Sequence, residues 1–271
     1  MPPPSEQAAR DLLAFYAEAG VDALVGEVPV DRFAAADPAP TIPAPAPTGE
    51  PRRPVSAPAV RQGTPVVAPD EAAMAARAAA RSAATLEELR AILDKFDGCA
   101  LKTTAKQMVF GDGNPRARIM FVGEAPGRDE DIEGVPFVGR SGKLLNLMIK
   151  AIGLARADTY ITNIIPWRPP GNRDPTPQES VICLPFIQRH IELVNPDILV
   201  CLGKPSSQTL LNIKDGILKS RGRWYSYATP ARQIRAMVTL HPAYLLRQPN
   251  QKRLAWRDFL AIQRELASTP A

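Results

Sequence analysis

The fold of this chain is decided by the stretch Arg118-Ile119-Met120-Phe121-Val122-Gly123-Glu124-Ala125-Pro126-Gly127. Its first half is a short apolar run of β type, and its second half is a Gly- and Pro-rich turn that carries one carboxylate, Glu124. In α/β proteins, a buried strand that empties into such a turn presents a functional loop at its carboxyl end. We therefore expect residues 118–122 to form a strand and residues 123–127 to belong to a ligand site.

Strand-like and helix-like segments alternate downstream of this turn. The pattern predicts strands over 118–122, 159–164, 197–202 and 236–240, and helices over 141–152, 176–194, 205–211 and 251–266. Because parallel strands need helical crossovers, this rhythm predicts an α/β fold, a three-layer αβα architecture with a central, mostly parallel four-stranded sheet. The loops after the strands, at 123–140, 163–175, 203–205 and 241–247, would then gather at one edge of the sheet, where ligands bind.

The upstream part of the chain has a different composition. Residues 1–33 predict a short helical segment over 5–25 that begins at Ser5, and residues 34–69 predict a Pro- and Ala-rich linker too poor in packing residues to fold. Residues 70–271 then form the main domain. Its first helical stretch is expected to break at Thr85, which caps a second helix with Glu88 at the third position.

The bulk composition is that of an ordinary globular protein. The chain has 271 residues, of which 45% are hydrophobic and 23% charged. No apolar run approaches the roughly 20 residues that span a bilayer, and the N-terminus lacks the features of a signal peptide, so we expect a cytoplasmic protein without a membrane partner. The net charge of +5 favours a polyanionic partner, and a solvated basic face is the alternative.

Two residues in the predicted loops could recognise a planar ring. Phe137 lies in the glycine-bounded segment 134–139, where an aromatic side chain could stack on a base. Asn163 ends an otherwise apolar strand, and its carboxamide offers two donors and an acceptor in one plane, which matches the edge of a pyrimidine. The alternatives are a core phenylalanine and an Asx-turn asparagine.

Two further residues could act on a ligand in these loops. His241 follows a predicted strand and precedes a proline, so it is a candidate for stabilising charge on a leaving group, whereas His190 falls in mid-helix and is expected to be structural. Glu124 has room for a close ligand among its glycines, and a solvent-facing turn residue is the alternative.

Five motifs in this order resemble those of the uracil-DNA glycosylase superfamily, most closely its family 4: Gly123-Glu124-Ala125-Pro126-Gly127, Gly134-Val135-Pro136-Phe137-Val138-Gly139, Thr162-Asn163, Pro169-Pro170-Gly171-Asn172-Arg173 and His241-Pro242-Ala243. The resemblance covers roughly Cys99 to the C-terminus. It implies a DNA repair enzyme that flips uracil out of single- or double-stranded DNA and hydrolyses its N-glycosidic bond. The products would be an abasic site and free uracil.

The resemblance also implies roles for individual residues. Glu124 would line the hydrolytic side, Asn172 would lie near the sugar, and His241 would donate to uracil O2. The substrate-binding set would be Gly123, Ala125, Phe137 and Asn163, with Phe137 as stacking platform and Asn163 as reader of the uracil edge. The DNA-binding set would be Arg140, Lys143, Arg173, Tyr244, Leu245, Leu246 and Arg247, of which residues 244–247 would fill the gap left by the flipped nucleotide.

The chain departs from the family pattern at two places. Ala125 stands where the best-known branch has a water-activating Asp, so attack must rely on Glu124, Asn172 or a water held by backbone groups. Family 4 members typically carry a [4Fe-4S] cluster, but Phe96 stands at the first ligand position, and Cys99 and Cys183 match later ones. Because four thiolates are needed and the chain has three cysteines, we expect no cofactor, although another residue type could complete a cluster.

The leading hypothesis is therefore a monomeric, monofunctional uracil-DNA glycosylase. A uracil-DNA binding protein with little turnover is the first alternative, and a nucleotide-binding module without DNA specificity is the second.

Overall fold

The computed structural model describes residues 69–268. The predicted helix over 5–25 and the predicted linker lie outside the described residues, except that Pro69, the last residue of the predicted linker, begins a helix. Among the described residues, no helix is long and apolar enough to cross a bilayer.

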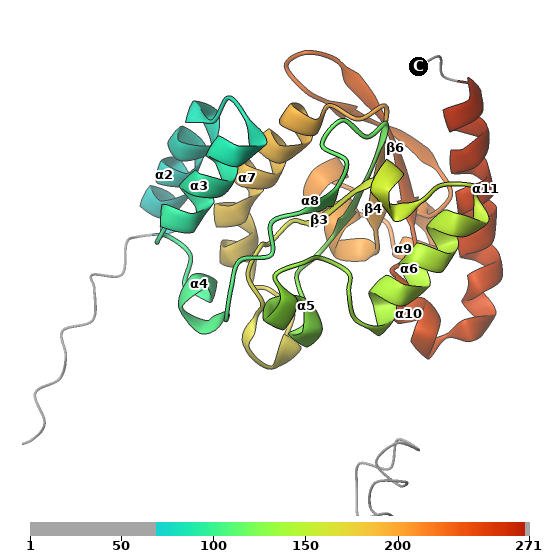
Figure 1. Ribbon diagram of the computed structural model, residues 1–271, viewed down its shortest axis with the longest axis horizontal. Coiled ribbons are helices and arrows are strands. Elements are labelled where there is room, and N and C mark those ends of the chain that lie inside the picture. Colours follow the sequence, from blue (N-terminus) through green and yellow to red (C-terminus); the bar gives the residue numbers. More distant parts are fainter. Residues whose placement is uncertain (1–68, 269–271) are drawn as a thin grey trace, which may run out of the picture. The chain divides into compact units, whose positions relative to one another are not determined.

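A six-stranded sheet with the order β1-β3-β2-β4-β6-β5 forms the centre of the described domain (Figure 1). Its strands are β1 (Asp112–Gly113), β2 (Ile119–Gly123), β3 (Tyr160–Asn163), β4 (Ile198–Leu202), β5 (Trp224–Ala228) and β6 (Gln233–Thr239). The four central strands are parallel and are the ones predicted. The prediction misses the antiparallel edges β1 and β5, because β1 has two residues and β5 is a partly exposed arm of a hairpin.

The central strand β2 is buried along its whole length. Ile119 and Phe121 point into one hydrophobic core, whereas Met120 and Val122 point into the other. This alternation follows from the two-residue period of a strand, and a strand covered on both faces reads as a continuous apolar run. The predicted three-layer αβα architecture is confirmed.

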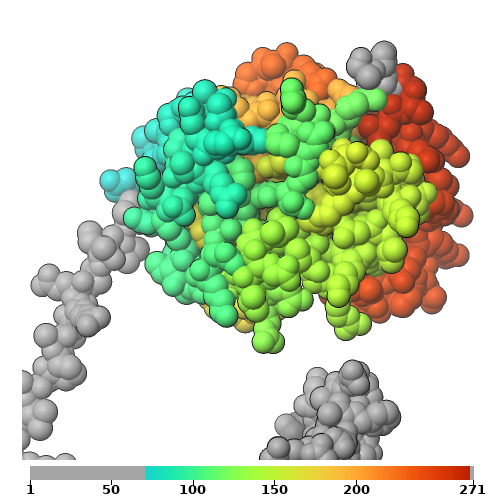
Figure 2. Space-filling view, viewed as in Figure 1, coloured from blue at the N-terminus to red at the C-terminus, as the bar shows by residue number. Residues whose placement is uncertain are grey.

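Helices cover both faces of the sheet (Figure 1). The core that contains Met120 and Val122 is covered by α2 (Pro69–Ser82), α3 (Leu86–Lys95), α7 (Pro177–Val194) and α8 (Lys204–Leu211). The core that contains Ile119 and Phe121 is covered by α6 (Arg140–Ala151) and α11 (Lys252–Ser268). The shorter helical elements are α4 (Leu101–Thr104), α5 (Arg128–Glu133), η1 (Arg156–Asp158), η2 (Pro170–Asn172), α9 (Ile217–Ser220), α10 (Pro242–Arg247) and η3 (Pro249–Gln251). On the face seen in Figure 2, the segments from α2 to α6 form a continuous surface.

Side-chain caps set the helix boundaries that the sequence predicts. Thr85 Oγ1 accepts a hydrogen bond from Glu88 N at 3.2 Å, which separates α3 from α2. Thr176 and Glu179 form a reciprocal capping box at the start of α7, with distances of 3.2 and 2.7 Å. Such caps satisfy amide groups that have no partner within the helix.

His190 is structural, as predicted. Its Nε2 lies 2.8 Å from the Tyr160 hydroxyl, and its ring stacks on Phe110 with centroids 4.3 Å apart. Burial lowers the pKa of His190 to about 3, so the ring is neutral inside the core.

Candidate active site

A pocket of about 500 Å³ opens at the carboxyl ends of the parallel strands. Its walls come from the segments after β2, β3, β4 and β6, which are the loops predicted to gather at one edge of the sheet. β2 lies between β3 and β4, so the chain order reverses here, and such switch points are the usual ligand sites of open α/β sheets. Six predicted catalytic or substrate-binding residues line it: Glu124, Ala125, Phe137, Asn163, Asn172 and His241.

One wall of the pocket is formed where Phe137 and Asn163 converge on Gly123. A Cβ atom on Gly123 would lie 2.4 Å from Asn163 Oδ1 and 2.7 Å from Phe137 Cζ, so any side chain there would displace one or both of these groups. Gly123 lies beside Asn163 in the β2–β3 register, which brings the carboxamide to the end of the neighbouring strand. Gly123 does not itself line the pocket, but its lack of a side chain lets the ring and the carboxamide approach.

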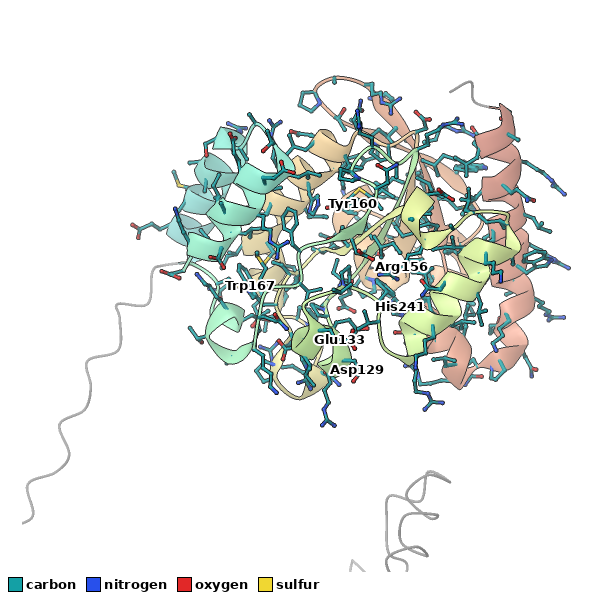
Figure 3. The ribbon with its side chains drawn as sticks, viewed as in Figure 1. Asp129, Glu133, Arg156, Tyr160, Trp167 and His241 are labelled. Atoms are coloured by element: carbon teal, nitrogen blue, oxygen red, sulfur yellow. The ribbon has the colours of Figure 1, made fainter. Side chains whose placement is uncertain are left out.

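His241, which is labelled in Figure 3, follows β6, and its ring centroid lies 5.6 Å from that of Phe137. It is the N-cap of α10, and its Nδ1 accepts a hydrogen bond from Ala243 N at 3.1 Å. Burial, and then the positive charge of Arg247, lowers the pKa of His241 to about 4. The imidazole is therefore neutral near pH 7, and because Nδ1 is an acceptor, the ring proton resides on Nε2.

Glu124 is a half-buried carboxyl that lines the pocket. Burial, and then the negative charge of Asp174, raises the pKa of Glu124 to about 7. Glu130 and Asp174 line the same pocket, so Glu124 is one of three carboxyl groups there. A group with a pKa near the working pH can exchange a proton during a reaction.

Asn172 and Arg173 come from the η2 segment at the pocket mouth. Asn172 has a left-handed φ of 54°, and its Oδ1 accepts a hydrogen bond from Arg168 Nε at 2.7 Å. Arg173 forms a two-pronged pair with Glu179 at 2.6 and 2.9 Å. The start of α7 thus anchors the segment that carries both residues.

Comparisons with known proteins decide the family. The Uracil DNA glycosylase superfamily matches residues 110–260 of the chain. This chain belongs to the uracil-DNA glycosylase superfamily. The Type-4 uracil-DNA glycosylase of Sulfurisphaera tokodaii is 42% identical over 191 residues, which is 69% of this chain and 86% of that protein. The Type-4 enzymes of Archaeoglobus fulgidus and Thermotoga maritima are 42% and 41% identical over 60% of this chain, and over 84% and 86% of their own lengths.

The residues that the family resemblance assigns to DNA binding fall into two groups. Arg173, Tyr244 and Arg247 line the pocket, whereas Arg140 and Lys143 are exposed on α6 outside its lining. In α10, Leu246 is half-buried, but Leu245 is 1% exposed and packs in a small core beside Leu240 and Ala255. Leu245 therefore supports α10 from within and does not face a DNA strand. The DNA contacts of the others stay a prediction.

Two charged residues that shape this glycosylase pocket were not predicted. Glu130 in α5 is 7% exposed and accepts hydrogen bonds from three loop amides. A Glu three residues after Gly127 is the signal that could have found it, because that spacing favours a helix-capping contact. Arg156 in η1 binds two carbonyl groups of the Phe137 loop. Its local sequence gives no signal, since its partners lie some 20 residues upstream.

The family pattern implies a [4Fe-4S] cluster, and the residues here do not fit it. Cys99 and Cys183 are buried and face each other, which lowers the pKa of Cys99 and raises that of Cys183. The same core contains Trp167, which is 2% exposed (Figure 3), and Phe96, whose ring packs edge-on against Phe186 with centroids 4.9 Å apart. Aromatic rings thus fill space around the thiol pair. Among residues 69–268, no group of three or more Cys, His, Asp or Glu side chains could hold a metal ion.

Proposed function

We propose that this chain is a DNA repair hydrolase that removes uracil from DNA, the activity for which its relatives, the Type-4 uracil-DNA glycosylases, are named. The observation that carries the proposal is the convergence of Phe137, Asn163 and His241 on one pocket at the switch point of the sheet. An enzyme that acts on a base must extrude it from the duplex into such a pocket. A ring platform, a planar amide and a neutral ring N–H together suit a flipped pyrimidine.

Binding of the base follows from these three side chains. The flipped uracil lies against Phe137, and the carboxamide of Asn163 pairs with its donor and acceptor edge. Gly123 leaves the space that this arrangement needs. Stacking on an aromatic side chain contributes about 1 to 3 kcal/mol per base.

Cleavage breaks the bond between C1′ and N1, and the bonding electrons leave with uracil. Negative charge then grows on uracil O2, where the Nε2–H of His241 can donate a hydrogen bond without transferring its proton. Positive charge grows on the sugar, and the carboxylates of Glu124 and Asp174 line the same pocket. The water oxygen bonds to C1′, and its released proton passes to Glu124 or to solvent. We assign water activation to Glu124, because its pKa of about 7 suits a proton acceptor, whereas Asn172 Oδ1 already accepts a hydrogen bond from Arg168.

We also propose that the enzyme works without an iron–sulfur cluster. The support is the set of possible iron ligands. Cys99 and Cys183 supply two thiols, but their neighbours Phe96 and Trp167 in the same core are aromatic residues, which are not iron–sulfur ligands. A colourless protein, without absorbance at about 400 nm, is the expected result. A brown protein with stoichiometric iron would contradict it.

We further infer a cytoplasmic monomer that binds uracil-containing DNA and releases free uracil. The net charge of +5 suits a polyanion. The three cysteines show no disulfide framework. Light scattering should give the mass of one chain, and a dimer mass would contradict the monomer.

The function is tested on end-labelled oligonucleotides that contain one uracil, in single- and double-stranded form. Incubation followed by alkali should give cleavage at the uracil position, and the strand should stay intact without alkali, because a monofunctional enzyme leaves an abasic site. A gel shift without cleavage would show the alternative, a uracil-DNA binding protein with little turnover. Equal binding of thymine and uracil DNA without cleavage would show a nucleotide-binding module.

A further inference from the structure

The loop that carries Phe137 has a conformation that its own sequence disfavours. Phe137 has a φ of 54°, in the left-handed region that residues with a side chain rarely adopt. The loop also lies directly on α6, because a Cβ atom on Gly142 would fall 1.8 Å from the carbonyl oxygen of Phe137. Surrounding groups must therefore hold this backbone in place.

Arg156 holds the loop by hydrogen bonds to the backbone carbonyl groups of Pro136 and Phe137. Its Nη2 donates to Pro136 O at 2.6 Å, and its Nη1 donates to Phe137 O at 3.1 Å. Nη1 also donates to Asn146 Oδ1 at 2.9 Å on α6, and Nε donates to Asp112 Oδ2 at 2.7 Å on β1. The planar guanidinium group thus fixes the loop to α6 and to the edge of the sheet at once.

Glu130 holds the same loop from the side of its amide groups. Its Oε1 accepts from Val138 N and Gly139 N, both at 3.0 Å. Its Oε2 accepts from Gly127 N at 3.1 Å, which ties the Phe137 loop to the turn that carries Glu124. Consecutive peptide groups from 136 to 139 are therefore bound by two side chains of opposite charge.

The geometry points to Arg156 as a positioning residue for base recognition, with Glu130 as its counterpart. Together they fix residues 136–139 so that the ring of Phe137 lies next to both Gly123 and His241. Arg156 is not among the residues that line the pocket, so it acts on uracil through Phe137 and not by contact. This inference rests on the proposed function and deepens it.

A general structural role is the competing explanation, since Arg156 also ties β1 to η1 through Asp112. Arg232 provides a matched control. Its guanidinium also binds two backbone carbonyls, Asn195 O at 2.7 Å and Pro196 O at 2.8 Å, and it pairs with Asp197. None of these partners lines the pocket, so Arg232→Gln should lower the melting temperature without changing the excision rate.

The test is a double-mutant cycle on single-turnover excision of uracil, with enzyme in excess so that slow variants can be measured. Arg156→Gln should lower the rate about 10- to 100-fold, because a displacement of about 1 Å in a site can cost 100-fold. In the Phe137→Ala background, the same change should lower the rate less than about 3-fold, since the ring that Arg156 positions is gone. Arg156→Lys should also lose rate, because an ammonium group cannot bridge two carbonyls with a planar fork.

The outcomes separate the inference from the proposed function. Multiplicative effects of Arg156→Gln and Phe137→Ala, wild-type rates in Arg156→Lys, or a loss in Arg232→Gln as large as in Arg156→Gln would each overturn the positioning role. If Arg156→Gln does not fold, Arg156→Lys takes its place in the cycle. Failure of the wild-type protein to excise uracil would instead overturn the proposed function.

Discussion

At the scale of single residues, the site combines a neutral histidine with a carboxyl group that titrates near pH 7. The sequence predicts that Glu124 and His241 share a pocket, since both follow strands of a parallel sheet. It cannot predict the protonation states, because these depend on burial and on neighbours such as Asp174 and Arg247. It also misses Arg156, whose contacts exist only once the chain is folded.

The pH dependence of excision tests the role of Glu124. If the ionised carboxylate supports cleavage, the rate should rise with pH through about 7, whereas neutral His241 limits activity only below about pH 4. Asp174→Asn should move the midpoint to lower pH, because it removes a negative charge that raises the pKa of Glu124. Burial is the larger cause, so the shift should be partial.

The measurement is a single-turnover rate profile between about pH 5 and 9. Asp94→Asn on the exposed surface of α3 is the matched control and should leave the midpoint unchanged. An unchanged midpoint in Asp174→Asn would contradict a role for the Glu124 ionisation in the rate.

Gly123→Ala tests the pocket wall. The added methyl group would collide with Asn163 Oδ1 and the Phe137 ring, so excision should fall at least about 100-fold. Gly216→Ala is the control, because a Cβ atom there meets nothing within 4 Å and its φ is −64°. Equal rates in the two variants would mean that the close approach at Gly123 does not matter for the reaction.

At the scale of elements, the spacing of apolar residues and the cap residues predict most ends of the helices and strands to within one residue. The four parallel strands and the start of α7 follow from local sequence, because a buried strand and a capping box leave local signatures. The short elements α5 and α10 do not, since they lie within segments that read as loops. They are held by tertiary contacts, such as the packing of Leu245 and the amide bonds of Glu130.

Thr176→Ala tests the capping of α7. Loss of the hydroxyl leaves the amide of Glu179 without its partner, so the free energy of unfolding should fall by about 1 kcal/mol. Thr176→Ser keeps the acceptor and should remain close to wild type. Urea denaturation measures both, and an alanine variant as stable as wild type would show that the cap contributes nothing.

At the scale of the whole molecule, two cores on either side of one sheet hold the pocket at the sheet's edge. The alternation of strand-like and helix-like segments along the sequence predicts this three-layer architecture, because the alternation extends over the whole domain. They do not predict how the core accommodates His190, whose neutral ring is held by Tyr160 and Phe110.

The stability of the domain should depend on pH through His190. Its pKa is lowered in the folded state to about 3, so the unfolded chain binds a proton first as the pH falls below about 6.5. Between pH 7 and 4.5, this residue should remove roughly 2 to 3 kcal/mol from the free energy of unfolding. Above pH 7 it should have no effect.

Urea denaturation of wild type and His190→Leu at pH 7 and at pH 4.5 checks this. The variant should be less stable at pH 7, because the Tyr160 hydroxyl loses its partner, but its stability should fall less on acidification. The same loss in both proteins would assign the acid sensitivity to other groups.

The most direct test of the central claim is the amount of free uracil released from uracil-containing DNA, measured by mass spectrometry beside the abasic sites formed. Wild type should release one uracil per abasic site, and His241→Ala and Asn163→Ala should each lower the rate at least about 100-fold while retaining the wild-type circular dichroism spectrum. Wild-type release rates in both variants, or no release by the wild-type protein, would contradict the account.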